Sequence, residues 1–211
     1  AREVARQSIV LLKIKDKLLP LKKDIRTLAV IGPNADNVYN MLGDYTAPQV
    51  DGTVVTVLDG IRQKVSKETR VLYAKGCAVR DSSRTGFKDA IETARNADAV
   101  VMVMGGSSAR DFSSEYEETG AAKVTINQIS DMESGEGYDR ATLHLMGRQL
   151  ELLEEISRLG KPVVLVLIKG RPLLMEGAIQ EAEAIVDAWY PGMQGGNAVA
   201  DVLFGDYNPA G

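Results

Sequence analysis

Residues 163–168 carry the sequence VVLVLI, a short apolar run rich in β-branched side chains. Runs of this kind are typical of strands that are buried on both faces of a sheet. Four more occur along the chain, at residues 27–31, 71–74, 99–104 and 184–188. Five buried strands predict a mostly parallel sheet.

Segments with helical periodicity lie between these runs, at residues 56–65, 87–97, 146–159 and 197–204. In the first of them Thr56 and Asp59 form a capping pair. Strand and helix alternate along the chain, which is the pattern of a doubly wound sheet with right-handed crossovers. We therefore expect an α/β domain with helices on both faces of the sheet, a flavodoxin-like α/β sandwich.

The chain of 211 residues is long enough for one large α/β domain. We expect residues 1–26 to form a lead-in helix and linker, and residues 27–211 to form the sheet domain. Because the chain begins without Met inside an amphipathic stretch, we expect it to be part of a longer polypeptide.

Composition argues against several classes of protein. The chain is 45% hydrophobic and 26% charged, with a net charge of −4 and no run of Lys and Arg, so a nucleic-acid partner is not expected. It has no apolar segment of ~20 residues that would span a membrane. Cys77 and His144 are the only residues of their types, which excludes a Cys/His zinc cluster. We expect no metal and no cofactor.

The longest segment after a predicted strand is the loop of residues 105–139, which is rich in carboxylates. Ligands of open α/β sheets bind beyond the carboxyl ends of the strands, and loops of this length are usually functional or disordered. Within it Glu136 lies between two glycines, which let a substrate approach closely. A carboxyl group presented in this way suits a general acid. On the residues alone, a surface turn with a solvated Glu136 is the more common alternative.

Several ordered pieces of the sequence resemble the C-terminal domain of the family 3 glycoside hydrolases. They are the lead-in at residues 5–13 and 18–21, the strand and turn at residues 29–35, the loop at residues 134–140, and the final strand and helix at residues 189–192 and 200–209. The resemblance covers nearly the whole chain.

What the resemblance implies is a retaining, exo-acting β-glucosidase or β-xylosidase that removes terminal non-reducing β-D-glycosyl residues. An N-terminal barrel of the same enzyme would supply an Asp nucleophile, which this chain lacks. By alignment to the family motif Glu136 would be the general acid/base, with the two carboxyls ~5 Å apart. Glu115 is the second choice, since other members take this group from a Glu reached sooner after the same strand.

The resemblance has further implications for partners and location. The substrate would be an oligosaccharide or an aryl β-glycoside, and the enzyme would be periplasmic or secreted. We expect Arg110, Asp111 and Tyr138 to contact the sugar, although Arg110 and Asp111 also fit a simple ion pair of the loop. Trp189 and Tyr190 follow a buried strand and suit the core or a domain interface.

Two non-catalytic hypotheses remain open at this point. One is a flavodoxin-like module that binds a small ligand at the strand ends, and the other is a carbohydrate-binding module in which Glu136 has no catalytic role. The sequence does not distinguish a glucoside from a xyloside.

Overall fold

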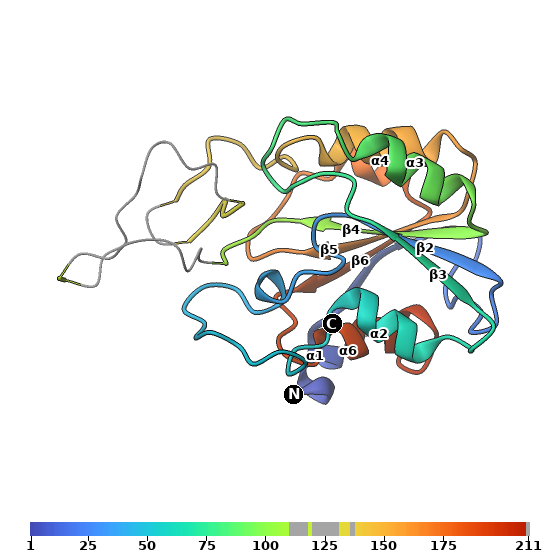
Figure 1. The fold of residues 1–211 in the computed structure, drawn as a ribbon, viewed down its shortest axis with the longest axis horizontal. Helices are drawn as coiled ribbons and strands as arrows, with labels where there is room; N and C mark the ends of the chain where they lie inside the picture. The colour runs from blue at the N-terminus through green and yellow to red at the C-terminus, as the bar shows by residue number, and fades with distance from the viewer. Residues whose placement is uncertain (110–117, 120–130, 136–137, 210–211) are drawn as a thin grey trace.

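The computed structural model describes residues 1–109, 118–119, 131–135 and 138–209 (Figure 1). Its centre is a sheet in the order β1-β6-β5-β4-β2-β3. The strands are β1 (Val10–Ile14), β2 (Thr27–Ile31), β3 (Arg70–Ala74), β4 (Ala99–Gly105), β5 (Val163–Ile168) and β6 (Ala184–Trp189). All neighbours are parallel except β1, which pairs with β6 in antiparallel orientation. Without β1 the order is that of flavodoxin, so the predicted fold class is confirmed.

Helices cover both faces of this sheet (Figure 1). One face carries α1 (Arg2–Ser8), α2 (Val57–Lys64) and α6 (Gly195–Leu203). The other carries α3 (Phe87–Arg95), α4 (Gln149–Ser157) and α5 (Glu176–Glu181). A short 3₁₀ helix, η1 (Tyr39–Met41), follows β2.

The two central strands divide the core into two layers. Every residue of β4 and β5 is buried. Val101 and Val166 pack in the cluster under α2 and α6, whereas Val100 and Leu165 pack in the cluster under α3 and α4. This alternation is the period of two that a strand imposes on its side chains, and it explains why these runs are apolar throughout.

The lead-in contains an element that the sequence analysis did not predict. After α1 the chain forms strand β1, whose side chains are only partly buried and include Lys13. The Lys13 ammonium donates to the carbonyl oxygen of Ala182 at 2.6 Å, and the pairing has an irregularity between Leu11 and Lys13. A half-exposed edge strand with a lysine lacks the continuous apolar pattern of a buried strand. The sheet therefore begins at Val10, inside the expected lead-in.

The helix boundaries follow local chemistry. Thr56 caps α2 as predicted, because its hydroxyl accepts a hydrogen bond from the backbone N–H of Asp59 at 3.2 Å. Helix α4 begins at Gln149 rather than at residue 146. Gly147 precedes it with φ of +62°, and a Cβ there would lie 2.8 Å from the carbonyl oxygen of Asp81. The predicted helix is therefore shortened at its start.

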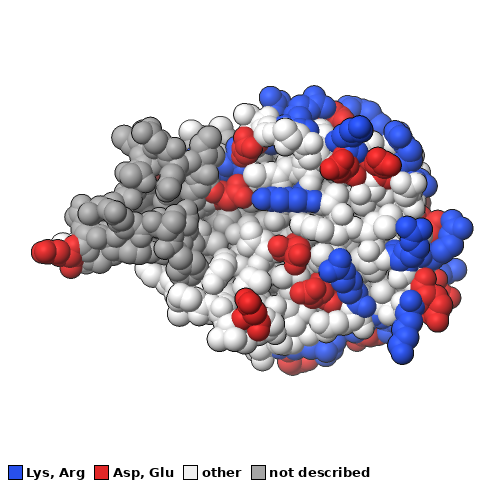
Figure 2. Space-filling model, in the orientation of Figure 1, with Lys and Arg blue, Asp and Glu red and all other residues white. Residues whose placement is uncertain are grey.

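The topology defines where a ligand site is expected. In a doubly wound sheet the crevice lies where the strand order reverses, which here is between β2 and β4. The carboxyl ends of these strands point to the left in Figure 1. On the face shown in Figure 2, acidic and basic side chains are interspersed over the described surface.

Candidate functional site

Two glycines form the edge of the site at the carboxyl ends of β2 and β4. Gly32 follows β2 and Gly105 ends β4, and both have φ of +132°. A Cβ on Gly32 would lie 2.1 Å from the carbonyl oxygen of Val103, and a Cβ on Gly105 would lie 2.0 Å from that of Ile168. Only glycine fits either position, and the chain leaves both strands in close contact with its neighbours.

A buried polar network connects the segments that follow these strands. The amide of Asn34 donates to the carbonyl oxygens of Gly106 at 3.0 Å and Ile168 at 3.3 Å. The amide of Asn40 donates to Asn34 Oδ1 at 2.7 Å, and the hydroxyl of Ser107 donates to Asn40 Oδ1 at 2.6 Å. All three side chains are buried. A satisfied network of this kind holds the crevice in one arrangement.

Glu133 and Arg140 form a buried ion pair beside this network. Glu133 Oε2 lies 2.8 Å from Arg140 Nη1, and the two side chains are 1% and 2% exposed. The backbone N–H of Glu133 donates to the carbonyl oxygen of Ser107 at 2.8 Å. Arg140 Nη2 also donates to the carbonyl oxygen of His144. The pair therefore joins the end of the long loop to the crevice.

Gly135 and Tyr138, which lie between these two residues in the sequence, pair through their backbones. The backbone N–H of Tyr138 donates to the carbonyl oxygen of Gly135 at 3.2 Å, and the two residues form an antiparallel bridge. A Cβ on Gly135 would lie 3.0 Å from Asp44 Oδ2 and 3.6 Å from the Cβ of Ser108. Gly135 thus lies close to the segments that follow β2 and β4, and Tyr138 pairs with it.

The predicted site residues fall into two groups. Tyr138 is half-buried and pairs through its backbone with Gly135. Glu136, Glu115, Arg110 and Asp111 lie outside the described residues.

Comparison with known proteins identifies the family. The model of the glycosyl hydrolase family 3 C-terminal domain matches residues 9–211. The chain belongs to this family. It is 42% identical to a β-xylosidase of Formosa agariphila and 37% identical to a periplasmic β-glucosidase of Salmonella typhimurium, in each case over 100% of this chain and 27% of the relative.

A solved structure gives the same result. The chain superposes with a TM-score of 0.81 on a family 3 exo-β-xylosidase in complex with a xylobiose aziridine activity-based probe, at 31% identity over 100% of this chain and 24% of that one. The chain therefore spans about a quarter of the length of the relatives it matches. It corresponds to one domain of enzymes that carry others.

A second charged cluster of this family 3 domain lies at the carboxyl ends of β5 and β6. Lys169 Nζ lies 2.6 Å from Asp187 Oδ2, and both side chains are 5% exposed. The same ammonium lies 3.8 Å from the centre of the Trp189 ring. Trp189 has φ of +54° and is 40% exposed. The Tyr190 ring packs closely against Gly43 and Gly170, so Tyr190 is largely a packing residue.

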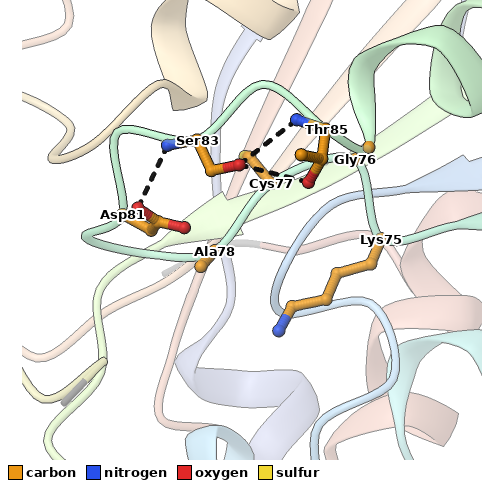
Figure 3. A pocket seen from close by; sticks show the side chains of 8 residues that line it. Lys75, Gly76, Cys77, Ala78, Asp81, Ser83 and Thr85 are labelled. Atoms are coloured by element: carbon orange, nitrogen blue, oxygen red, sulfur yellow. Dashed lines mark hydrogen bonds between the residues drawn. The ribbon is translucent and has the colours of Figure 1, made fainter. Parts of the chain in front are cut away.

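A hollow is lined by residues of the segment 75–86, which follows β3 at the same edge of the sheet (Figure 3). Its polar groups bind one another: Asp81 accepts from the backbone N–H of Ser83 at 3.0 Å, and the Ser83 and Thr85 hydroxyls lie 3.1 Å apart. Lys75 points away from them. Burial raises the pKa of the Cys77 thiol to about 12, with a further contribution from Asp131, so this cysteine is a packed thiol rather than a nucleophile.

Sequence reasoning did not single out three residues of the site: Asn40, Glu133 and Asp187. Asp187 carried a signal, since it is a carboxylate inside a run of buried apolar residues. Asn40 and Glu133 occur in polar segments, where nothing in the sequence distinguishes a buried side chain from a solvated one.

Two further observations concern only the part of the chain that the structure describes. No group of three or more His, Cys, Asp and Glu side chains there is arranged to hold a metal ion. None of its helices is long and apolar enough to cross a membrane.

Proposed function

We propose that this chain supplies the general acid/base of a retaining, exo-acting β-glycosidase, and that Glu136 is that residue. The substrate would be an oligosaccharide or aryl glycoside with a terminal β-D-xylosyl or β-D-glucosyl residue. Glu136 would protonate the glycosidic oxygen while the nucleophile attacks the anomeric carbon. It would then deprotonate the water that releases the sugar.

The observation that supports this proposal best is the pairing of Gly135 with Tyr138 beside the β2–β4 crevice. These residues flank Glu136 and its neighbour in the sequence, and the proximity of Gly135 to Asp44 and Ser108 supports the proposal that the acid/base segment belongs to this site. The names of the relatives, β-xylosidase and β-glucosidase, support the reaction class.

The nucleophile would come from a barrel domain that precedes this chain in the full-length enzyme. The length of the relatives supports this part of the proposal, because the chain spans only about a quarter of them. Covalent catalysis with retention needs both carboxyl groups. The isolated 211-residue chain should therefore not hydrolyse aryl β-xylosides or β-glucosides above the uncatalysed rate. Turnover that disappears when a residue of this chain is changed would contradict the division into two half-sites.

The acid/base is tested in the full-length enzyme with substrates of different leaving groups. For Glu136→Ala we expect a loss of roughly 10²- to 10⁴-fold on disaccharides, because their leaving oxygen needs a proton. The glycosylation step of a dinitrophenyl glycoside should lose less, since that group leaves unaided. Azide should restore turnover by attacking the glycosyl-enzyme without deprotonation.

Two variants make this test specific. Glu118→Ala is the matched control, because Glu118 is an exposed carboxylate of the same loop, and it should behave like the parent. Glu115→Ala tests the second choice. If Glu115→Ala shows the selective loss and the azide rescue while Glu136→Ala does not, then Glu115 is the acid/base. If neither does, the chain acts as a binding module instead.

A further inference from the structure

The ion pair of Glu133 and Arg140 closes a loop within the chain. The two residues are separated by the segment 134–139, and their side chains meet at 2.8 Å with almost no exposed surface. Within this segment Gly135 and Tyr138 pair through their backbones. The ion pair joins Glu133 to Arg140, and the backbone bridge joins Gly135 to Tyr138.

Glu133 contacts Gly106 and Ser107, the two residues that follow β4. A Cβ on Gly106 would lie 1.9 Å from Glu133 Oε1, so the carboxylate occupies the space that a side chain at residue 106 would take. The backbone N–H of Glu133 donates to Ser107, whose hydroxyl belongs to the network with Asn40. The carboxylate thus has a defined position relative to the crevice.

The hydrogen bonding of the pair argues against a purely stabilising role. Among the described residues, no well-aligned donor reaches Glu133 Oε2 and no acceptor reaches Arg140 Nε, although the two groups are in ionic contact. Removing two charges from water is costly, and an ion pair with incomplete hydrogen bonds does not recover that cost. Replacing a buried ion pair by apolar residues of similar volume is often neutral or stabilising for a fold. The two charges therefore contribute more to the position of the segment between Glu133 and Arg140 than to the stability of the fold.

We propose that Glu133 and Arg140 are positioning residues that fix the acid/base segment against the carboxyl end of β4. This inference rests on the proposed function, in which Glu136 lies between them in the sequence. General acid catalysis needs the acid within hydrogen-bond reach of the leaving oxygen, so a displaced segment loses proton transfer before it loses sugar binding.

The test uses the full-length enzyme and two independent perturbations. Glu133→Gln removes one charge of the pair. Gly106→Ala keeps both charges and displaces the carboxylate, because the new methyl group needs the space of Oε1. For both variants we expect kcat on disaccharides to fall about 10- to 100-fold, as for a catalytic group misplaced by about 1 Å. KM and the glycosylation rate of a dinitrophenyl glycoside should change less than about 3-fold. Arg140→Lys, which keeps the charge, should lose less than Arg140→Gln.

Asp201→Asn is the matched control, since it makes the same kind of change at a buried carboxylate on α6, far along the chain from this segment. It should lower the melting temperature and leave the dependence on the leaving group unchanged. If Glu133→Gln and Gly106→Ala behave in the same way, the pair is structural and the inference is wrong. Should Glu133→Gln not fold, the leaving-group dependence of Gly106→Ala and Arg140→Lys decides.

Glu136→Ala, measured in parallel, distinguishes a failure of the proposed function from a failure of the positioning role. If it shows no selective loss, the proposed function itself fails. If it shows the selective loss while Glu133→Gln and Gly106→Ala do not, only the positioning role fails.

Discussion

Two buried carboxylates of this domain contact arginine, but their surroundings differ. Asp201 on α6 is fully buried and accepts hydrogen bonds from Arg2 Nε at 2.7 Å, from Arg6 Nε at 2.6 Å and from Lys64 Nζ. Among the described residues, Glu133 has one cationic partner, and its Oε2 accepts no well-aligned hydrogen bond. The carboxylate of Asp201 is thus bound by three basic residues, whereas that of Glu133 is paired with Arg140 in the part of the chain that the structure describes.

The two carboxylates therefore contribute to different properties of the domain. Asp201 joins α1, α2 and α6, three helices on one face of the sheet (Figure 1). Burial opposes its ionisation, but the hydrogen bonds from Arg2, Lys64 and Arg6 outweigh burial and hold the pKa of Asp201 well below its usual range. Changes in the Asp201 cluster should therefore affect stability alone, whereas changes in the buried Glu133–Arg140 pair should affect activity as well as stability.

The largest expected effects on stability come from removing one partner of a buried ionic cluster, and Asp201→Asn is one such change. Removing one partner of a buried ionic cluster leaves charge without compensation, so the free energy of unfolding should fall by roughly 3 kcal/mol, the lower end of the usual range because Arg2 is partly exposed. Urea denaturation of the 211-residue chain measures this. The control is Asp206→Asn, at a partly exposed partner of Lys23 and Lys64, where less than about 1 kcal/mol is expected. Equal effects of the two variants would remove the distinction that we draw for Asp201.

The same cluster predicts a dependence on pH. A carboxyl group whose pKa is lower in the folded state stabilises the protein above its unfolded pKa of about 3.9. This contribution is complete at neutral pH and is lost as the pH falls below about 4. The difference in unfolding free energy between the parent and Asp201→Asn should therefore shrink on acidification. A difference that stays constant between pH 7 and pH 3 would show that Asp201 stabilises through packing alone.

The fold was predictable because its signals are local and redundant. The five apolar runs match β2 to β6 within one residue at each end, and Thr56 caps α2 as its spacing with Asp59 indicates. Strand β1 was not predictable in the same way, because an edge strand buries only part of its side chains. Its pairing depends on β6, which is about 170 residues away in the sequence.

The candidate site was predictable only in part. The sequence indicates the loop after β4, but it does not reveal that Glu133 is buried. That burial depends on the missing side chain of Gly106 and on Arg140, and no periodic pattern connects the three. The proposed acid/base, Glu136, remains a prediction, because its support is the resemblance and the pairing of its flanks.

A second, smaller effect contrasts two glycines. A Cβ on Gly60 in α2 would lie 2.1 Å from the backbone carbonyl oxygen of Gly196 in α6, which no side-chain rotation relieves. Gly60→Ala should therefore lower the free energy of unfolding by about 1–3 kcal/mol, despite the better helix propensity of alanine. Gly177→Ala in α5 is the control, because its Cβ meets only the flexible Leu150 side chain at 3.0 Å, and it should be close to neutral.

Glycine variants also distinguish the contact between α2 and α6 from the contact between Gly106 and Glu133. Gly60→Ala should reduce stability without changing the leaving-group dependence of the full-length enzyme. Gly106→Ala should change that dependence with a smaller loss of stability, because its methyl group meets a side chain rather than a backbone. Thermal melting and kinetics on the same two proteins test this, and an exchange of the two phenotypes would reverse the roles assigned to the two regions.

The smallest effect is expected at the exposed ion pair next to Arg140. Arg171 Nη1 lies 3.1 Å from Asp139 Oδ1, but Arg171 is 37% exposed and Asp139 is 88% exposed. The pKa of Asp139 lies below its usual value, first because the backbone N–H of Arg140 donates to it and then because of Arg171. Pairs with this exposure are screened by water and salt and contribute little. Arg171→Ala should therefore melt within about 1 °C of the parent, and added salt should reduce this difference further. Arg140→Gln, one residue from Asp139 but buried, should show a larger change in the same experiment, and similar curves for the two variants would mean that burial does not distinguish these arginines.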